Sequence, residues 1–140
     1  MKFTKDQLKT IYDRTTGYCH ICGKKLAFKN YADFNARASW EVEHSNPQAN
    51  GGTHHLNNLY AACISCNRSK GKTSTKTVRI RNGRTSAPLS VPKRKEAKAS
   101  NAFVGGATGA LIGGRIAGLP GAAVGALVGA VFGHNRNPDK

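Results

Sequence analysis

The chain has 140 residues, a length that allows one domain with a tail or two very small units. Its formal net charge of +15 and its pI near 10.2 favour a polyanionic partner, either nucleic acid or an anionic membrane surface. The N-terminal residues MKFTKDQLKTIYDR lack the apolar run of a secretory signal peptide. We therefore expect a cytoplasmic protein whose four cysteines are reduced thiols or metal ligands rather than disulfides.

The first predicted element is a helix that begins after Thr4 and ends near Gly17. Thr4 and Gln7 have the spacing of a capping box, in which each side chain accepts a hydrogen bond from the backbone of the other residue. Leu8 and Ile11 then share one face of the helix.

Two short strands and a helix follow. Residues 39–44 alternate in strand fashion, and residues 46–52 are rich in turn formers. Residues 59–62 read as a second strand, and residues 64–72 can form a short helix. This order predicts a ββ hairpin with one helix.

Four cysteines occur as two pairs, Cys19-x-x-Cys22 and Cys63-x-x-Cys66. Two such pairs suit a closed tetrahedral zinc site with four thiolates. A redox pair is the competing interpretation, but neither pair lies near a βαβ pattern. The surrounding region is too small to depend on hydrophobic burial alone, so a structural Zn²⁺ is physically reasonable. His20, inside the first pair, is expected at the surface.

Any hydrolysis needs a second site, because a closed four-thiolate zinc has no open position. Glu43 and His44 are adjacent at the predicted strand end, and Asn67 follows the last cysteine. A carboxylate and an amide oxygen suit Mg²⁺, and a nearby neutral imidazole can take a proton from water. We expect Glu43 and Asn67 to face each other across a cation beside His44.

The ordered motifs CxxC, WEVEH, GG, NNL and CxxCN-x-x-K together resemble the HNH endonuclease family. The resemblance covers about residues 4–72 and implies an α+β fold of the ββα-metal type. It implies that His44 is the general base and that Asn58 is the central asparagine that braces the loop. It also implies that Glu43 and Asn67 bind the catalytic cation, and that zinc binds the four cysteines.

The chain departs from the common family pattern at two of these positions, with Asn67 in place of histidine and Glu43 in place of aspartate. Loss of an imidazole ligand favours Mg²⁺ or Mn²⁺ over softer metals. Asn57 is the second candidate for the bracing role.

The expected partner is DNA in duplex form, with no small-molecule cofactor. Arg68, Lys70 and Lys72 extend from the predicted helix and are expected to contact phosphates. His54 and His55 could face substrate or simply be exposed, and the sequence does not separate these alternatives.

Residues 73–100 form a predicted basic linker without sustained periodicity, apart from a short possible strand at 78–81. Half of the 22 lysines and arginines lie between residues 68 and 98. This run is either a solvated flexible arm or a phosphate-binding arm.

Residues 101–134 are apolar and glycine-rich, with glycines repeated at four-residue spacing. On a helix this spacing gives a smooth face for close packing, and it resembles glycine-zipper hairpins. Leu119–Gly121 is the expected break. The resulting segments are short for a bilayer span, so residues 102–133 are expected to insert at a membrane interface or to self-associate. A flexible low-complexity tail is the alternative.

The sequence thus predicts a metal-dependent HNH endonuclease that hydrolyses DNA phosphodiester bonds. The alternative is a non-catalytic, zinc-dependent nucleic-acid-binding module with a membrane-interacting tail. The expected organisation is a nuclease domain at 1–72, a basic linker at 73–100, a glycine-rich segment at 101–134 and a polar tail at 135–140.

Overall fold

The computed structural model describes the backbone of residues 2–136 and 138, and the side chains of these residues except for 109–125. The chain divides into two compact units, Met1–Val91 and Pro92–Lys140. The first unit therefore continues well beyond the predicted domain end at residue 72.

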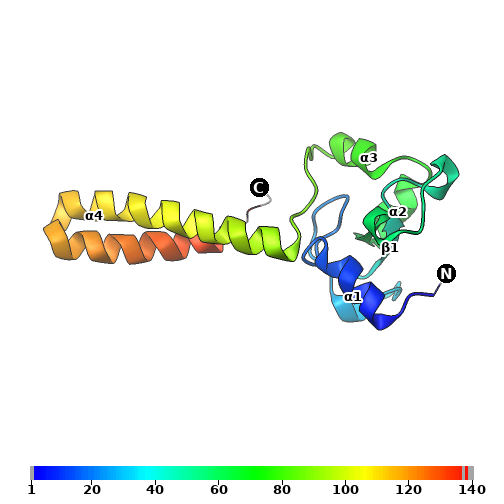
Figure 1. The fold of residues 1–140 in the computed structure, drawn as a ribbon, viewed down its shortest axis with the longest axis horizontal. Helices are drawn as coiled ribbons and strands as arrows, with labels where there is room; N and C mark the ends of the chain where they lie inside the picture. Colours follow the sequence, from blue (N-terminus) through cyan, green and yellow to red (C-terminus); the bar gives the residue numbers. More distant parts are fainter. Residues whose placement is uncertain (1, 137, 139–140) are drawn as a thin grey trace. The chain divides into compact units, whose positions relative to one another are not determined.

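The helices and strands occur in the order shown in Figure 1. Their bounds are α1 (Lys5–Asp13), η1 (Phe28–Asn30), β1 (Trp40–His44), η2 (Gln48–Asn50), η3 (Leu56–Asn58), β2 (Leu59–Cys63), α2 (Ile64–Lys70), α3 (Thr75–Arg81) and α4 (Val91–Asn135).

The predicted capping box of α1 is confirmed. The Thr4 hydroxyl accepts from the Gln7 amide at 3.2 Å, and the Gln7 side chain accepts from the Thr4 amide at 2.9 Å. The helix ends at Asp13, before Gly17, which has a φ of +69°. A Cβ at Gly17 would meet the Tyr12 ring at 2.4 Å, so this turn needs glycine for space as well as for its left-handed φ.

The predicted ββα arrangement is present. β1 and β2 pair antiparallel, with Glu43 opposite Tyr60 and His44 opposite Leu59. α2 follows β2 directly and packs on both strands. This packing brings the middle and the end of α2, at Asn67 and Lys70, to the same face of the hairpin as the side chains of Glu41 and Glu43.

Trp40 is the centre of the core of the first unit and is fully buried. Its indole Nε1 donates to the Phe28 carbonyl at 3.2 Å, and the rings of Tyr12, Phe28 and Tyr31 surround it. Ile11 of α1 belongs to the same buried cluster. The hairpin is thus covered on its second face by α1 and by the segment that precedes β1.

The possible strand at residues 78–81 is wrong, because these residues lie in helix α3. Ser74 caps α3 by accepting from the Thr77 amide, a helix-start signal that the sequence analysis missed. The Thr75 amide donates to the Ser45 carbonyl at 3.0 Å, and Thr75 is fully buried. α3 is therefore part of the first unit and not of a linker.

In the second unit, α4 doubles back on itself (Figure 1). Residues near Gly105 lie against Gly129 and Gly133, since a Cβ built on Gly105 would meet the Gly129 carbonyl oxygen at 2.2 Å. A Cβ on Gly133 would meet the Asn101 carbonyl oxygen at 2.1 Å. At these described positions only glycine leaves room for the backbones to approach so closely. The predicted break at Leu119–Gly121 lies outside the residues whose side chains are described.

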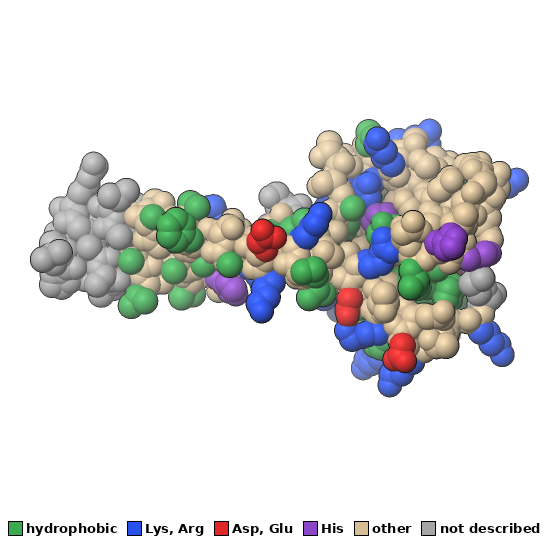
Figure 2. All heavy atoms as spheres, in the orientation of Figure 1, with side chains coloured by type: hydrophobic (Ala, Val, Ile, Leu, Met, Phe, Trp, Pro, Cys, Tyr) green, Lys and Arg blue, Asp and Glu red, His purple; other side chains and the backbone are tan. Residues whose placement is uncertain are grey.

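Large apolar side chains are exposed on the described parts of α4, as the green side chains in Figure 2 show. Phe103 is 80% exposed and Phe132 is 73% exposed. Within the described residues, the structure contains no helix whose length and apolarity would let it cross a bilayer.

The close approach at Gly105 predicts that Gly105→Ala will separate the two halves of α4, because the added methyl would overlap a carbonyl oxygen. Hydrogen exchange of residues 101–108 and 126–133 should become faster. Gly106→Ala is the matched control, since its Cβ would meet neighbours only at 3.5 and 3.6 Å. This control should slow exchange slightly, through the helix preference of alanine over glycine of about 1 kcal/mol. Equal exchange in both variants would contradict the packing.

Candidate functional site

The four cysteines converge at the corner between β2 and α2. Their Sγ atoms all lie within 4.8 Å of one another, and the Cys22 and Cys63 sulfurs are 3.9 Å apart. Four thiolates around one zinc at about 2.3 Å would lie about 3.8 Å from each other. The backbone amides of Cys22 and Cys63 point at the Cys19 sulfur, at 3.5 and 3.3 Å. This four-cysteine cluster fits a closed structural zinc site.

The ionisation of the cluster also calls for a cation. Hydrogen bonding with Cys19, and then with Cys22, lowers the pKa of Cys63. Hydrogen bonding with Cys19, and then with Cys63, raises the pKa of Cys22. The Cys63 thiolate is therefore favoured over that of Cys22, and a bound metal would stabilise thiolates at both positions.

We predict one tightly bound zinc per chain, and loss of both zinc and folded structure in the first unit when Cys63 is replaced by serine. Zinc affinity at such a site is folding free energy, so removing one ligand removes much of the stability. Metal content by mass spectrometry and fluorescence of Trp40, the only tryptophan, report the two effects. A metal-free Cys63→Ser variant with wild-type stability would contradict this assignment.

The loop between β1 and β2 is held by the Asn58 side chain. Its Oδ1 accepts from the Asn46 amide at 2.8 Å, and its Nδ2 donates to the carbonyls of Asn46 and Thr53 at 3.0 and 2.8 Å. These bonds join both sides of the loop just after His44. The structure therefore gives the bracing position to Asn58 and not to Asn57.

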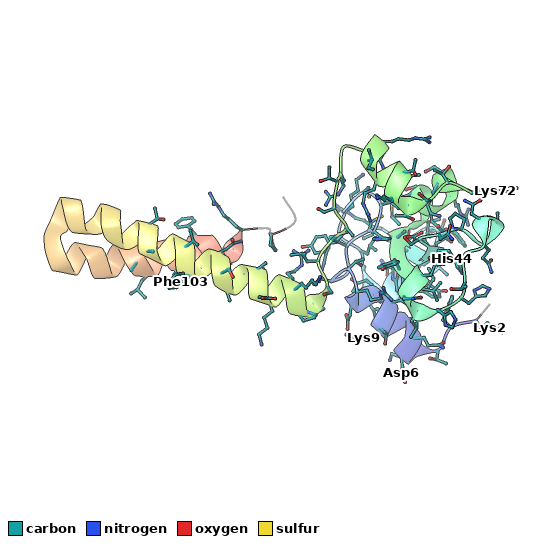
Figure 3. The ribbon with its side chains drawn as sticks, turned by 45° about the horizontal axis from the view of Figure 1, so that its top comes forward. Lys2, Asp6, Lys9, His44, Lys72 and Phe103 are labelled. Carbon is teal, nitrogen blue, oxygen red and sulfur yellow. The ribbon has the colours of Figure 1, made fainter. Side chains whose placement is uncertain are left out.

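His44 ends β1 and is half-buried; its side chain is labelled in Figure 3. Its Nε2 lies 3.0 Å from Nδ1 of His54, and the two rings meet edge to face. Nε2 of His54 in turn contacts the Gln48 amide. Partial burial, followed by the neighbouring His54, lowers the pKa of His44. A neutral imidazole near neutral pH is the form that can accept a proton.

Two surface grooves adjoin His44. One has a volume of about 480 Å³ and is lined by His44, His54 and Gln48 together with Glu41. The other, of about 390 Å³, is lined by the Asn58-braced loop and by Lys76 of α3. The end of β1 is therefore open to water and to an extended substrate.

Glu43 does not have the surroundings that the sequence predicts. It is fully buried: Oε1 lies 2.6 Å from Nδ1 of His20, and Oε2 accepts from the Thr75 hydroxyl at 2.8 Å. The Lys70 ammonium is 3.5 Å from Oε2. The alternation of β1 turns Glu43 toward α2 and α3, which cover it.

The prediction of a surface position for His20 is wrong, since this residue is only 4% exposed. Its Nε2 accepts from the Arg79 guanidinium at 2.9 Å, its Nδ1–H donates to Glu43, and its ring stacks on Tyr60 at 3.8 Å. Burial lowers the pKa of His20 against the opposing effect of Glu43. The sequence signal for this contact was slight, because the partners lie on distant elements.

Asn67 contacts Glu41 rather than Glu43. Its Nδ2 donates to Glu41 Oε1 at 3.0 Å. Glu43 holds a donor on each oxygen and has an ammonium group close by, so it offers no open position to a cation. The contacts of the predicted pair thus run to different partners, with Glu43 on His20, Thr75 and Lys70 and Asn67 on Glu41.

Of the three predicted phosphate contacts, the structure places one inside the domain. Lys70 is 5% exposed, and its ammonium donates to the His44 carbonyl at 2.9 Å, so its expected contact with phosphate is corrected to an internal one. Lys72 is exposed and is labelled in Figure 3. The Arg68 side chain is 61% exposed and stacks over Phe34 at 4.4 Å.

The burial of Glu43 predicts that Glu43→Gln will destabilise the first unit by about 3 kcal/mol, because Lys70 loses its buried counter-charge. Urea unfolding followed by Trp40 fluorescence measures this change. The control is Glu41→Gln, the same replacement on the same strand face, where the side chain is 21% exposed and its ion pair with Arg68 is solvated. This control should change the free energy of unfolding by less than about 1 kcal/mol. Equal effects would show that the Glu43 contacts contribute little.

Comparison with known proteins agrees with the ββα unit. A sequence model of the HNH endonuclease family matches residues 19–73. The match includes the four-cysteine cluster, His44 and Asn58, and it indicates a nuclease-type function for this part of the chain. Searches of curated proteins and of solved structures gave no match. α3 lies outside the matched residues, although Thr75 and Arg79 complete the contacts around Glu43 and His20.

Proposed function

We propose that this protein is a DNA endonuclease in which His44 takes a proton from the water that attacks a phosphodiester. The observation that carries the proposal is the placement of His44. Within the matched HNH residues it ends β1 beside the Asn58-braced loop and lines an open groove. The four-cysteine cluster also adjoins a groove, but its sulfurs lie within 4.8 Å of one another and suit a closed metal site without an open position.

In the proposed reaction a water oxygen attacks phosphorus while His44 accepts one of its protons. The bond between phosphorus and the 3′ oxygen breaks, and that oxygen takes up a proton to become a hydroxyl. By resemblance to the family, the products carry 5′-phosphate and 3′-hydroxyl ends. The Lys70 bond to the His44 carbonyl and the Asn58 bonds to Asn46 hold the base on both sides.

HNH nucleases use divalent metals, and we expect Mg²⁺ or Mn²⁺ to be required. Glu43 is held by His20 and Thr75, and the Asn67 nitrogen donates to Glu41, so the Asn67 oxygen is the atom of this pair that could reach such an ion. Among the carboxylates of β1, Glu41 is the one that Asn67 contacts and that lines a groove with His44.

Duplex DNA is the proposed substrate. The net charge of +15 supports a polyanionic partner, and Figure 2 shows lysine and arginine side chains over the visible face of the first unit. Arg68, within α2, and Lys72, just after it, are exposed basic residues of the ββα region. Contacts of this kind position a duplex without reading its sequence.

The exposed apolar residues of α4 support a second proposal, that residues 102–133 associate with lipid or with another copy of the chain. Six of them lie in the described parts of residues 102–133: Phe103, Val104, Leu127, Val128, Val131 and Phe132. Apolar surface of this extent favours a covered state. Co-sedimentation with anionic vesicles, compared with light scattering in buffer, separates the two partners.

We predict that His44→Ala will reduce plasmid nicking in Mg²⁺ buffer by at least about a hundredfold while zinc content and DNA affinity stay near wild type. The control is His55→Ala, an exposed histidine of the same loop, which should cut normally. Wild-type cutting should stop when a chelator removes the weakly bound divalent ion. Wild-type activity in His44→Ala would contradict the role of His44, and DNA binding without cutting by the wild type would favour the non-catalytic module.

A further inference from the structure

His54 comes from a rigid part of the loop between β1 and β2. The carbonyl of the preceding residue, Thr53, accepts from Asn58 at 2.8 Å, and η3 begins directly after His55. Earlier in the loop a Cβ at Gly52 would lie 1.8 Å from the Asn46 carbonyl oxygen, so the backbone passes too closely for any side chain. The position of His54 is therefore fixed although its side chain is exposed.

The ring of His54 contacts the candidate base directly. Its Nδ1 lies 3.0 Å from Nε2 of His44, with ring centroids 5.0 Å apart. Its other nitrogen, Nε2, faces the Gln48 side-chain nitrogen, and a half-turn of this amide about its terminal bond places the Gln48 oxygen there instead. Three side chains thus form a chain that ends on His44.

The hydrogen bond between two neutral imidazoles contains one proton, and its direction decides whether His44 can act. If His54 donates, His44 Nε2 gives up its lone pair and neutral His44 carries its own hydrogen on Nδ1. No lone pair is then left for a proton from water. If His44 Nε2–H donates to His54 Nδ1, the lone pair of His44 lies on its Nδ1 and is available. The second arrangement requires His54 Nε2–H to donate to the Gln48 oxygen.

We propose that His54 is a positioning residue for His44: it accepts a hydrogen bond from His44 Nε2 and so fixes the tautomer and the ring orientation that let Nδ1 take a proton from water. This inference rests on the proposed nuclease function. Because His54 acts on His44 through a contact within the loop, its effect should fall on the chemical step and not on DNA binding.

The test compares His54→Ala with His54→Asn in the full-length protein, using a fluorescent duplex in Mg²⁺ buffer. Asparagine retains an acceptor one bond beyond Cγ, near the position of the lost Nδ1, while alanine has none. We expect His54→Ala to lower kcat about ten- to a hundredfold, part of what a general base contributes, with KM unchanged. His54→Asn should recover most of the loss, and His55→Ala should match wild type.

The double variant His44→Ala/His54→Ala checks that His54 acts through His44. It should be no slower than His44→Ala alone, because residues that act as a unit are not additive. A wild-type kcat for His54→Ala, an asparagine variant no better than alanine, or a further loss in the double variant would each overturn the role of His54. Each of these outcomes leaves the nuclease function standing. A wild type that fails to cut would overturn the function itself, and the role with it.

Discussion

The convergence of four sulfurs within 4.8 Å is the constraint on which the rest of the first unit depends. Cys19 and Cys22 belong to a turn after α1, whereas Cys63 and Cys66 belong to the corner of β2 and α2. A metal that joins them would fix α2 against the hairpin. The buried apolar core of this unit has few large side chains, chiefly Trp40, Ile11, Ile21 and Leu59. For so small a core, metal binding supplies stability that burial alone does not.

The turn that carries Cys19 and Cys22 also supplies His20 to a buried network of charged side chains. His20 lies between two cysteines of the four-cysteine cluster and donates to Glu43, whose other oxygen accepts from Thr75 of α3. Lys70 lies beside Glu43 and donates to the carbonyl of His44. Buried charges cost several kcal/mol unless they are paired and hydrogen-bonded, and here the histidine, hydroxyl and ammonium groups satisfy the carboxylate. A continuous set of hydrogen bonds and one ion pair therefore joins the four-cysteine cluster, α3 and the backbone of the candidate base His44.

The sequence predicted the local elements well because their signals are local. The Thr4 capping box, the alternation in β1, and the cysteine spacings each depend on a few neighbouring residues. The bracing role of Asn58 came from the family resemblance, and its three hydrogen bonds agree with it. The match of the family model to residues 19–73 lies within the region of that resemblance.

What the sequence did not predict depends on contacts between distant segments. The partners of His20 are 23 and 59 residues away, so no pattern around the cysteines could separate a buried ring from a surface one. Lys70 looked like a phosphate ligand because helix periodicity does not show which long side chain turns inward. α3 was missed because basic residues with no apolar period read as a linker, although Ser74 was a usable cap signal. The pairing of His44 with His54 likewise depends on how the loop closes.

The central claim is that this chain hydrolyses DNA by adding water to phosphorus. It is tested most directly by single-turnover cleavage of a duplex oligonucleotide in H₂¹⁸O, with mass spectrometry of the products. The account predicts one ¹⁸O atom in the newly formed 5′-phosphate, since the attacking oxygen comes from the water that His44 deprotonates. Intact duplex, or a cleaved product whose phosphate carries no ¹⁸O, would contradict it.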